Sequence, residues 1–402
     1  MKPTKLLLAL AATVCTTGNA MADDNGVVVP DSTGFKFTDV VTVKTTPVRD
    51  QNQSGTCWSF SADTFFEDEL LKLQNREVDL SEMYTVRMCY EEKALRYIRM
   101  YGQVNFSEGG GLLDVSYIMN KYGAMPEEAY PGLNYGEDSH DHSELVAALT
   151  AYLKSISQSK KLSKNAWFEG FRGILDAYFG EVPETFTYNG KTYTPKQYAE
   201  SLKLNLDNYM PFTSFTHHPF YEKFVLEVPD NWLFGLYMNV TIDDMKAIVD
   251  NSLKNGHAVL WAADVSEDGF NFRRGYALMP KEKSEADMTE DERNEWAKIS
   301  DRKRKEIAKD IKGPVEEIEI TQEVRQEMYD RQLTTDDHGM VIVGIATDQE
   351  GNRYYKVQNS WNTNQLYDGF FYVSEPYFLA KTMSFLVNKD VIPADIKAKI
   401  GL

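Results

Sequence analysis

Apolar residues recur at three- and four-residue spacing directly after Cys57, and this spacing predicts an α-helix that begins at the cysteine. The apolar positions are Ala62, Phe65, Phe66, Leu70, Leu71 and Leu73. A helix N-terminus offers unpaired backbone N–H groups and the positive end of the helix dipole, and both favour a thiolate. The pattern therefore indicates a reactive cysteine, while a small buried hydrophobic residue is the alternative interpretation of a free cysteine.

Two strand-like runs stand near the other end of the chain, at 338–344 and 355–361. They flank the segment 348–352, which is rich in Asp, Gly and Asn and is typical of a turn. We predict an antiparallel pair of strands here. Such a pair brings His338, at the start of one strand, close to Asn359, at the end of the next.

Most of the remaining chain shows helical patterns. Asp79 and Glu82 have the spacing of a capping box, and Thr194 followed by Pro195 predicts another helix start. A helix is predicted from Thr241, followed by a buried strand over 257–265. Residues 281–312 are dense in charge of both signs, which favours a solvent-facing helical insertion; a partner-binding arm is the alternative.

The first 22 residues are typical of an export signal. Lys2 and Lys5 precede an apolar run that is too short to span a membrane, and Ala20-Met21-Ala22 offers a cleavage site. We expect a periplasmic or secreted protein with no membrane contact after leader removal. A lipoprotein that uses Cys15 is disfavoured, because Val14 is a poor residue before a lipidated cysteine.

Charge and cysteine content narrow the class further. The formal net charge is −18 at pH 7, which repels nucleic acid and anionic membrane surfaces. The chain has 3 cysteines, and with Cys15 in the leader and Cys57 reactive, Cys89 has no partner for a disulfide. We interpret Cys89 as core packing, so stability depends on a large apolar core.

The chemistry predicted from these residues is acyl transfer. Cys57 is the nucleophile, His338 takes its proton and returns it to the leaving amine, and Asn359 orients the imidazole. Trp361 shields that hydrogen bond from water. Gln51, six residues before the cysteine, offers its side-chain N–H to the developing oxyanion, together with the Cys57 backbone N–H.

These motifs resemble those of papain-like cysteine peptidases, and more closely the bleomycin hydrolase and aminopeptidase C branch. The active-site motifs are Gln51, Gly55-Thr56-Cys57-Trp58, His338 and Asn359-Ser360-Trp361; the branch motifs are 108–114, 121–126, 213–221 and 255–261. The resemblance implies an α+β fold of the papain-like two-lobed type, with a helical lobe, a β-barrel-like lobe and helical insertions. It also implies peptide substrates, no cofactor and a hexameric homo-oligomer.

The resemblance divides the chain into six parts. They are the signal peptide 1–22, the helical lobe 23–135 with the catalytic cysteine, a mainly helical insertion 136–219, the first part of the β-rich lobe 220–280, the charged helical insertion 281–330, and the rest of the β-rich lobe 331–402 with the catalytic histidine and asparagine.

Substrate contacts are predicted at Gly110 and Gly111, because a glycine backbone permits close approach of an extended peptide. Trp361 is assigned to the same site. In the resembled branch a C-terminal arm restricts cleavage to free N-termini, and here that arm looks short, with Lys397 to Leu402 as the residues that could still reach the cleft. An aminopeptidase is therefore expected, an endopeptidase or an enzyme that releases short peptides is the alternative, and an inactive exported binding protein is a third reading.

No metal site is assigned from the sequence. Asp138, His140, Asp141, His142 and Glu144 crowd one loop, but a solvated acidic loop is the preferred interpretation. His217, His218 and His257 have no base-and-orienter partners in the sequence and are interpreted as structural.

Overall fold

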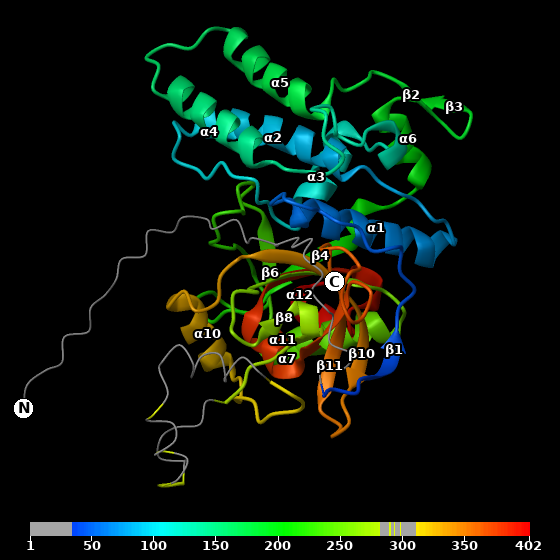
Figure 1. Cartoon of the computed structure of the whole chain (residues 1–402), viewed down its shortest axis with the longest axis vertical. Coiled ribbons are helices and arrows are strands. Elements are labelled where there is room, and N and C mark those ends of the chain that lie inside the picture. The colour runs from blue at the N-terminus through cyan, green and yellow to red at the C-terminus, as the bar shows by residue number, and fades with distance from the viewer. Residues whose placement is uncertain (1–33, 282–288, 291–292, 294–297, 299–310) are drawn as a thin grey trace, which may run out of the picture.

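The computed structural model describes residues 34–281, 289–290, 293, 298 and 311–402 (Figure 1). The predicted leader and most of the charge-dense segment 281–312 lie outside these described residues. Within them, no helix is both long and apolar enough to cross a membrane.

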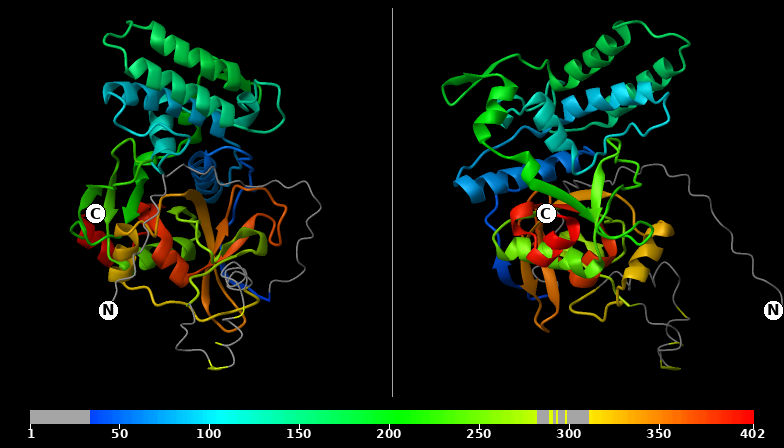
Figure 2. Two further views of the ribbon diagram at one scale, coloured as in Figure 1. Left: turned by 60° about the vertical axis from the view of Figure 1, so that its left-hand side comes forward. Right: turned by 180° about the vertical axis from the view of Figure 1, so that it is seen from behind.

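The chain folds into two lobes, with helices gathered at one end and a large sheet with its own helices at the other (Figures 1 and 2). The helical lobe holds α1 (Cys57–Gln74), α2 (Glu82–Arg99), α3 (Asp114–Tyr122), α4 (Ser143–Ser157), α5 (Ala166–Phe179), α6 (Pro195–Leu202) and the hairpin of β2 (Phe186–Tyr188) and β3 (Lys191–Tyr193). The predicted two-lobed α+β fold is confirmed, while the residue limits of the predicted domains stay a prediction.

The β-rich lobe is built on one large sheet. Its strands are β1 (Thr38–Thr42), β4 (Tyr209–Thr213), β5 (Lys223–Val225), β6 (Leu236–Asn239), β7 (Val259–Ala263), β8 (Phe270–Asn271), β9 (Tyr276–Ala277), β10 (His338–Thr347), β11 (Arg353–Gln358), β12 (Phe370–Ser374) and β13 (Thr382–Asn388). The order is β5-β6-β4-β13-β7-β10-β11-β12-β9-β8, with β1 also paired to β10. Strands β5 and β8 do not pair with each other, so over the described residues the sheet is open and not a closed barrel.

Helices and short 3₁₀ turns cover the sheet. They are α7 (Ile242–Lys254), α10 (Gln322–Asp330), α11 (Glu375–Lys381), α12 (Ala394–Ile400), η2 (Leu206–Asn208), η3 (Phe272–Arg274) and η4 (Lys389–Val391). The remaining turn, η1 (Glu127–Ala129), contacts β2 in the helical lobe. Strands β10 and β11 pair antiparallel with Val341 opposite Gln358, which confirms the predicted strand pair. The predicted helix after Thr241 is α7, and the predicted strand over 257–265 is β7.

Two predicted helix starts have different outcomes. Thr194 caps α6 in a capping box with Gln197, as predicted. The capping box predicted for Asp79 and Glu82 is wrong, because Ser81 caps α2 by accepting a hydrogen bond from the Tyr84 backbone N–H at 2.9 Å. Asp79 is instead ion-paired with Arg49 at 2.7 Å, which draws its carboxylate away from the helix end.

Helix α1 lies between the two lobes, and residues Trp58 to Leu71 are all buried (Figure 1). Its acidic side chains are therefore buried too, and three of them, Glu67, Asp68 and Glu69, accept hydrogen bonds from other segments of the chain. Glu69 accepts hydrogen bonds from His257, Tyr209 and Asn388 at 2.8, 3.0 and 3.0 Å. These contacts fix α1, and with it Cys57, against the sheet.

Candidate active site

Cys57 is the first residue of α1, where the first turn of N–H groups has no partner within the helix. Its sulfur accepts a hydrogen bond from the backbone N–H of Gly339 at 3.4 Å. A Cβ atom added at Gly339 would lie 3.3 Å from Trp58 Cα and 3.4 Å from the Cys57 carbonyl oxygen. Strand β10 therefore approaches α1 backbone to backbone, and this places the sulfur beside the residue that follows His338.

The proton positions on His338 follow from its partners. The Ser360 backbone N–H donates to Asn359 Oδ1 at 2.8 Å, which identifies that atom as the oxygen of the amide. His338 Nε2 lies 2.7 Å from the same oxygen, so Nε2 must donate. The neutral ring then carries its proton on Nε2, and Nδ1 remains as its proton acceptor. This is the tautomer that a general base requires.

An aromatic wall covers this hydrogen bond. The Trp361 ring stacks on His338 with a centroid distance of 4.4 Å and an interplanar angle of 30°. Phe270 and Phe272 meet Trp361 edge to face at 6.0 and 5.4 Å. His338 and Asn359 are both buried. The imidazole is thereby fixed in its plane, and its bond to Asn359 is held away from bulk water.

Burial favours the neutral forms of Cys57 and His338. It raises the pKa of the Cys57 thiol to about 12, with the Gly339 N–H acting in the opposite direction and the charges of Asp230 and Asp336 adding to the rise. Burial also lowers the pKa of His338 to about 4, against the effect of the Asn359 hydrogen bond. An ionised thiolate or imidazolium in this environment needs a nearby group of opposite charge to stabilise it.

Gln51 is held by two hydrogen bonds on its side chain. Its Nε2 donates to the Ser54 carbonyl oxygen at 2.6 Å, and its Oε1 accepts from the Ser360 hydroxyl at 2.7 Å. Its backbone N–H also donates to the Ser360 carbonyl oxygen at 2.9 Å. The amide is thus locked between the cysteine loop and the Asn359–Ser360 segment, with one N–H proton left for another acceptor.

Of the two predicted substrate glycines, Gly110 lies against Trp58. A Cβ atom at Gly110 would come within 2.8 Å of the Trp58 ring and 2.6 Å of Asp114 Oδ2, so no larger residue fits. Gly111 is less restricted, since its nearest neighbour would be the Tyr237 hydroxyl at 3.6 Å. Gly109, which the sequence did not select, is the most crowded, because its Cβ would lie 1.9 Å from Asp230 Oδ2.

A buried lysine holds this glycine segment in place. Lys93 Nζ donates to the carbonyl oxygens of Ser107 and Gly109 at 2.6 and 2.5 Å, and the residue is 2 % exposed. Trp58 Nε1 donates to the Glu108 carbonyl oxygen at 2.9 Å. These bonds fix the backbone of 107–109 beside the first turn of α1.

Two carboxyl groups, Asp230 and Asp336, lie in the same region and repel each other when both are ionised. Asp230 accepts hydrogen bonds from Asn105 and Ser107 at 3.0 and 3.3 Å, while no described residue donates a hydrogen bond to Asp336. Burial, followed by the charges of Asp230, Asp337 and Asp114, raises the pKa of Asp336 to about 8. A cation placed between Asp230 and Asp336 would relieve this repulsion.

The other predicted residues lie away from the sulfur. His257 is paired with Glu69 in the core, and Cys89 is fully buried, as both interpretations required. The interpretation of 138–144 as a solvated loop is wrong for its histidines: His140 is 8 % exposed and His142 is 0 % exposed. Both pack into the helical lobe, where His142 meets Phe179 edge to face at 5.3 Å.

The last residues lie on the β-rich lobe. Ile396 of α12 is buried, and Lys399 Nζ contacts the Asp244 carboxylate of α7 at 2.9 Å. Figure 2 shows this end of the chain on the outside of that lobe. The possibility that Lys397 to Leu402 fold into the cleft is therefore wrong in this structure, because α12 docks on α7.

Several residues of the site were missed by sequence reasoning. Asp336 lies two residues before His338 and could have been suspected from that spacing. Lys93, Asp230 and Gly339 gave no local signal, because each acts through a segment far away in the sequence.

Comparison with known proteins places the chain in a family. The Peptidase C1-like family matches residues 3–280 and 316–401, and the chain belongs to it. Aminopeptidase C from Lactococcus lactis subsp. cremoris is 23% identical over 385 residues, covering 86% of this chain and 81% of the relative. Bleomycin hydrolase from Rattus norvegicus is 23% identical over 412 residues, covering 90% of this chain and 84% of the relative.

A solved structure shares the fold. The crystal structure of pepw from Lactobacillus rhamnosis HN001 aligns with a TM-score of 0.68 at 20% identity, covering 90% of this chain and 84% of that one. The predicted membership of the papain-like cysteine peptidases, in the bleomycin hydrolase and aminopeptidase C branch, is confirmed.

Proposed function

We propose that this member of the Peptidase C1-like family is a thiol aminopeptidase in which Cys57, His338 and Asn359 form the catalytic triad and Gln51 completes the oxyanion site. The observation that carries the proposal is the chain of bonds from Ser360 N–H to Asn359 Oδ1 and on to His338 Nε2. These bonds leave Nδ1 of His338 free to act as a base. The next residue, Gly339, donates its backbone N–H to the Cys57 sulfur, where β10 meets α1.

The first chemical step transfers the Cys57 proton to His338 Nδ1 as the sulfur attacks the substrate carbonyl carbon. The imidazolium that forms keeps its Nε2–H bond to Asn359, and this bond is stronger when the ring is charged. The free N–H proton of Gln51 and the Cys57 backbone N–H bind the oxyanion. His338 then gives its proton to the leaving amine, which departs and leaves a thioester on Cys57.

Water completes the cycle. His338, neutral again, takes a proton from a water molecule that attacks the thioester carbonyl carbon. The second oxyanion occupies the same position near Gln51. The carbon–sulfur bond then breaks, and His338 returns the proton to the departing sulfur. The products are the shortened peptide from the first step and the free amino acid from the second, and the thiol of Cys57 is restored.

Asp230 and Asp336 provide the proposed anchor for the free N-terminus of the substrate. Their charges act on Cys57 and on each other, and Asp230 lies over Gly109 in the glycine segment. An α-ammonium group in this region meets two carboxylates, whereas an acylated N-terminus brings no charge to balance them. The relatives named aminopeptidase C and bleomycin hydrolase support the same assignment.

Paired substrates test the proposal. An aminoacyl-aminomethylcoumarin and its N-acetyl form are compared on the native chain and on a variant with Asp230→Asn and Asp336→Asn. We expect the native chain to prefer the free amine, and the double variant to lose about tenfold or more of that preference, since a hydrogen bond to a charged group contributes about 1.5–3 kcal/mol. Asp138→Asn, an exposed aspartate in the helical lobe, is the matched control.

The two alternative functions predict different results in this assay. Equal cleavage of blocked peptides by the native chain would support the endopeptidase alternative and remove the anchor. Absence of turnover with every peptide, together with an unreactive Cys57, would support the inactive binding protein.

We further propose that the chain acts outside the cytoplasm after removal of residues 1–22, and that it assembles into hexamers. The leader pattern supports export, and the family resemblance supports the assembly. N-terminal sequencing of the protein from a periplasmic or culture fraction tests the first point, with Asp23 as the expected first residue. Light scattering coupled to size exclusion tests the second.

A further inference from the structure

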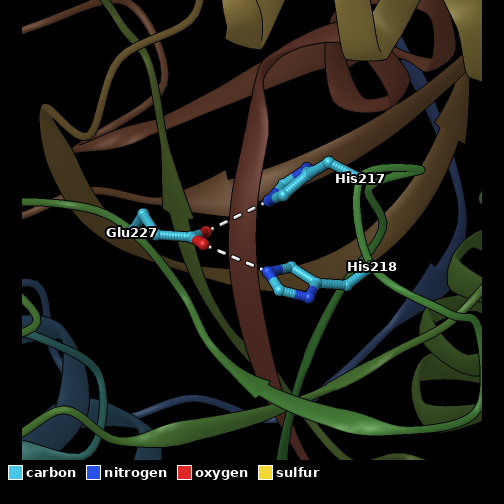
Figure 3. Close-up of side chains that lie close together, drawn as sticks. All are labelled: His217, His218 and Glu227. Carbon is cyan, nitrogen blue, oxygen red and sulfur yellow. Dashed lines mark hydrogen bonds and ion pairs between the residues drawn. The ribbon is translucent and has the colours of Figure 1, made fainter.

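Three side chains converge on one point beside the loop between β4 and β5 (Figure 3). His217 Nε2 lies 3.1 Å from Glu227 Oε2, and His218 Nε2 lies 3.1 Å from Glu227 Oε1. The three groups can each offer one ligand atom, and these atoms all lie within 4.8 Å of one another. The two rings come from neighbouring residues yet present the same nitrogen to one carboxylate.

These separations suit a small divalent metal ion. Histidine nitrogen and carboxylate oxygen ligands bind zinc at about 2.0–2.2 Å, and in a tetrahedral arrangement neighbouring ligand atoms are about 3.3 Å apart. The observed 3.1 Å is close to that value, so the carboxylate and either imidazole need little movement to share an ion. Three protein ligands leave one position for water.

Both rings are held in place by aromatic neighbours. His217 stacks on Tyr329 of α10 with an interplanar angle of 13° and a centroid distance of 5.5 Å. His218 stacks on Phe224 at 23° and 4.2 Å. A site whose rings are fixed before binding loses less conformational entropy when the ion arrives.

The surroundings admit a cation. The side chains of His217, His218 and Glu227 are 28%, 36% and 56% exposed, so an ion can enter from solvent. Within the described part of the chain, Glu227 forms ion pairs with these histidines and with no lysine or arginine. A divalent ion would supply the positive charge that this carboxylate lacks when the histidines are neutral.

We propose that His217, His218 and Glu227 form a binding site for a divalent transition metal ion of the zinc class. The site shares no residue with the proposed triad or Gln51 and plays no part in the proposed proton transfers. Two of its ligands lie in the β4–β5 loop, and the third, Glu227, follows β5. Asp230, which lies beside the glycine segment, comes three residues after Glu227. The bound ion fixes that loop and the wall of the cleft that follows it.

The hydrogen bond between Gln326 and His217 opposes metal binding at His217. Gln326 accepts from the Thr216 N–H at 2.5 Å and donates to Asp330 at 2.8 Å, which fixes the orientation of its amide. Its Nε2 lies 3.0 Å from His217 Nδ1, so without metal the His217 proton is on Nε2. An ion must displace this proton, and the ring then needs an acceptor at Nδ1 that Gln326 does not provide.

Zinc titration of the full chain tests the site. Cys57 is first alkylated with iodoacetamide so that its thiolate does not compete, and Zn²⁺ binding is followed by calorimetry, with Co²⁺ absorption in the visible range as a report on coordination geometry. We expect one ion per chain. Glu227→Gln and His218→Asn each remove a ligand and should weaken binding by more than the roughly 10- to 100-fold typical of changes to residues behind the ligands. Glu222→Gln, an exposed glutamate on the same loop, should leave binding unchanged.

Gln326→Glu distinguishes a metal site from a set of ordinary hydrogen bonds. The change is made together with Asp330→Asn, since Gln326 Nε2 donates to the Asp330 carboxylate in the native chain and a second carboxylate would be repelled there. A carboxylate at position 326 then accepts both the Thr216 N–H and a His217 Nδ1–H, which is the arrangement that orients metal-bound histidines. We expect this variant to bind Zn²⁺ more tightly than the native chain by about tenfold or more. A site that holds only hydrogen bonds would show no such gain.

The outcomes are separable from those of the peptidase assay, because binding is measured on the alkylated chain. Loss of binding in Glu227→Gln and His218→Asn, with retention in Glu222→Gln, supports the site. Absence of stoichiometric binding to the native chain, or equal binding in all these variants, overturns it.

Discussion

Replacing Asn359 with alanine tests the least exposed member of the proposed triad. The change removes the oxygen that accepts from His338 Nε2 at 2.7 Å and from the Ser360 N–H at 2.8 Å. His338 then lacks the bond that selects its Nε2–H tautomer, and the imidazolium lacks its acceptor. The stack against Trp361 does not depend on the amide and should keep the ring in its plane.

The size of the effect follows from the charged state of the histidine. A hydrogen bond to a charged group contributes about 1.5–3 kcal/mol, which corresponds to a rate factor of about 10- to 150-fold. The loss falls on kcat, because the imidazolium exists during proton transfer and not in the substrate complex. The loss of the acceptor also lowers the pKa of His338 further, since this bond opposes the effect of burial.

The assay measures kcat and KM on a free aminoacyl substrate, with the rate of Cys57 alkylation as a second readout. Asn364→Ala is the control, since Asn364 is an exposed asparagine five residues further along the chain. Circular dichroism and thermal melting of each variant establish that the fold is retained. We expect slower alkylation and a lower kcat in Asn359→Ala, and neither change in Asn364→Ala.

A loss of less than about threefold in kcat would contradict the reasoning, because the smallest contribution expected from a charged hydrogen bond is about tenfold. A rise in KM at constant kcat would contradict it as well. That result would mean that Asn359 binds substrate and does not stabilise the imidazolium.

Three further predictions concern the thiol, its electrostatic surroundings and the core. Cys57→Ala should abolish hydrolysis with the fold intact, and iodoacetamide followed by peptide mapping should label Cys57 before Cys89; preferential labelling of Cys89, which is fully buried, would refute the assignment. Asp230→Asn removes a negative charge that raises the pKa of Cys57, so the pH profile of alkylation should shift to lower pH; a shift to higher pH would contradict the Coulombic argument. Glu69→Gln leaves the buried His257 without its carboxylate and should lower the free energy of unfolding by about 3–5 kcal/mol in denaturant melts, compared with the exposed control Glu77→Gln; an unchanged midpoint would show that the network is not stabilising.

The active-site elements were largely predictable because their signals are local. Apolar spacing after Cys57 depends only on the geometry of one helix, and the turn at 348–352 depends only on its own residue types. Antiparallel pairing of the two strands then brings Asn359 close to His338, and no contact from elsewhere in the chain is needed to predict this. The capping box at Asp79 failed because Arg49, thirty residues earlier, pairs with that carboxylate, and no local pattern reports such a contact.

The sequence by itself determined the reactive residue types, their order and the secondary structure that carries Cys57 and His338. The tertiary structure decided which groups surround them. Helix α1 is buried between two lobes, so Glu69 and its neighbours are core residues, although periodicity alone places charged residues on a solvent face. Asp230 lies beside the glycine segment, and Gly339 meets the Cys57 sulfur, only after segments distant in sequence pack together. Charge and hydrogen-bond partners depend on distance in space, which a linear pattern does not contain.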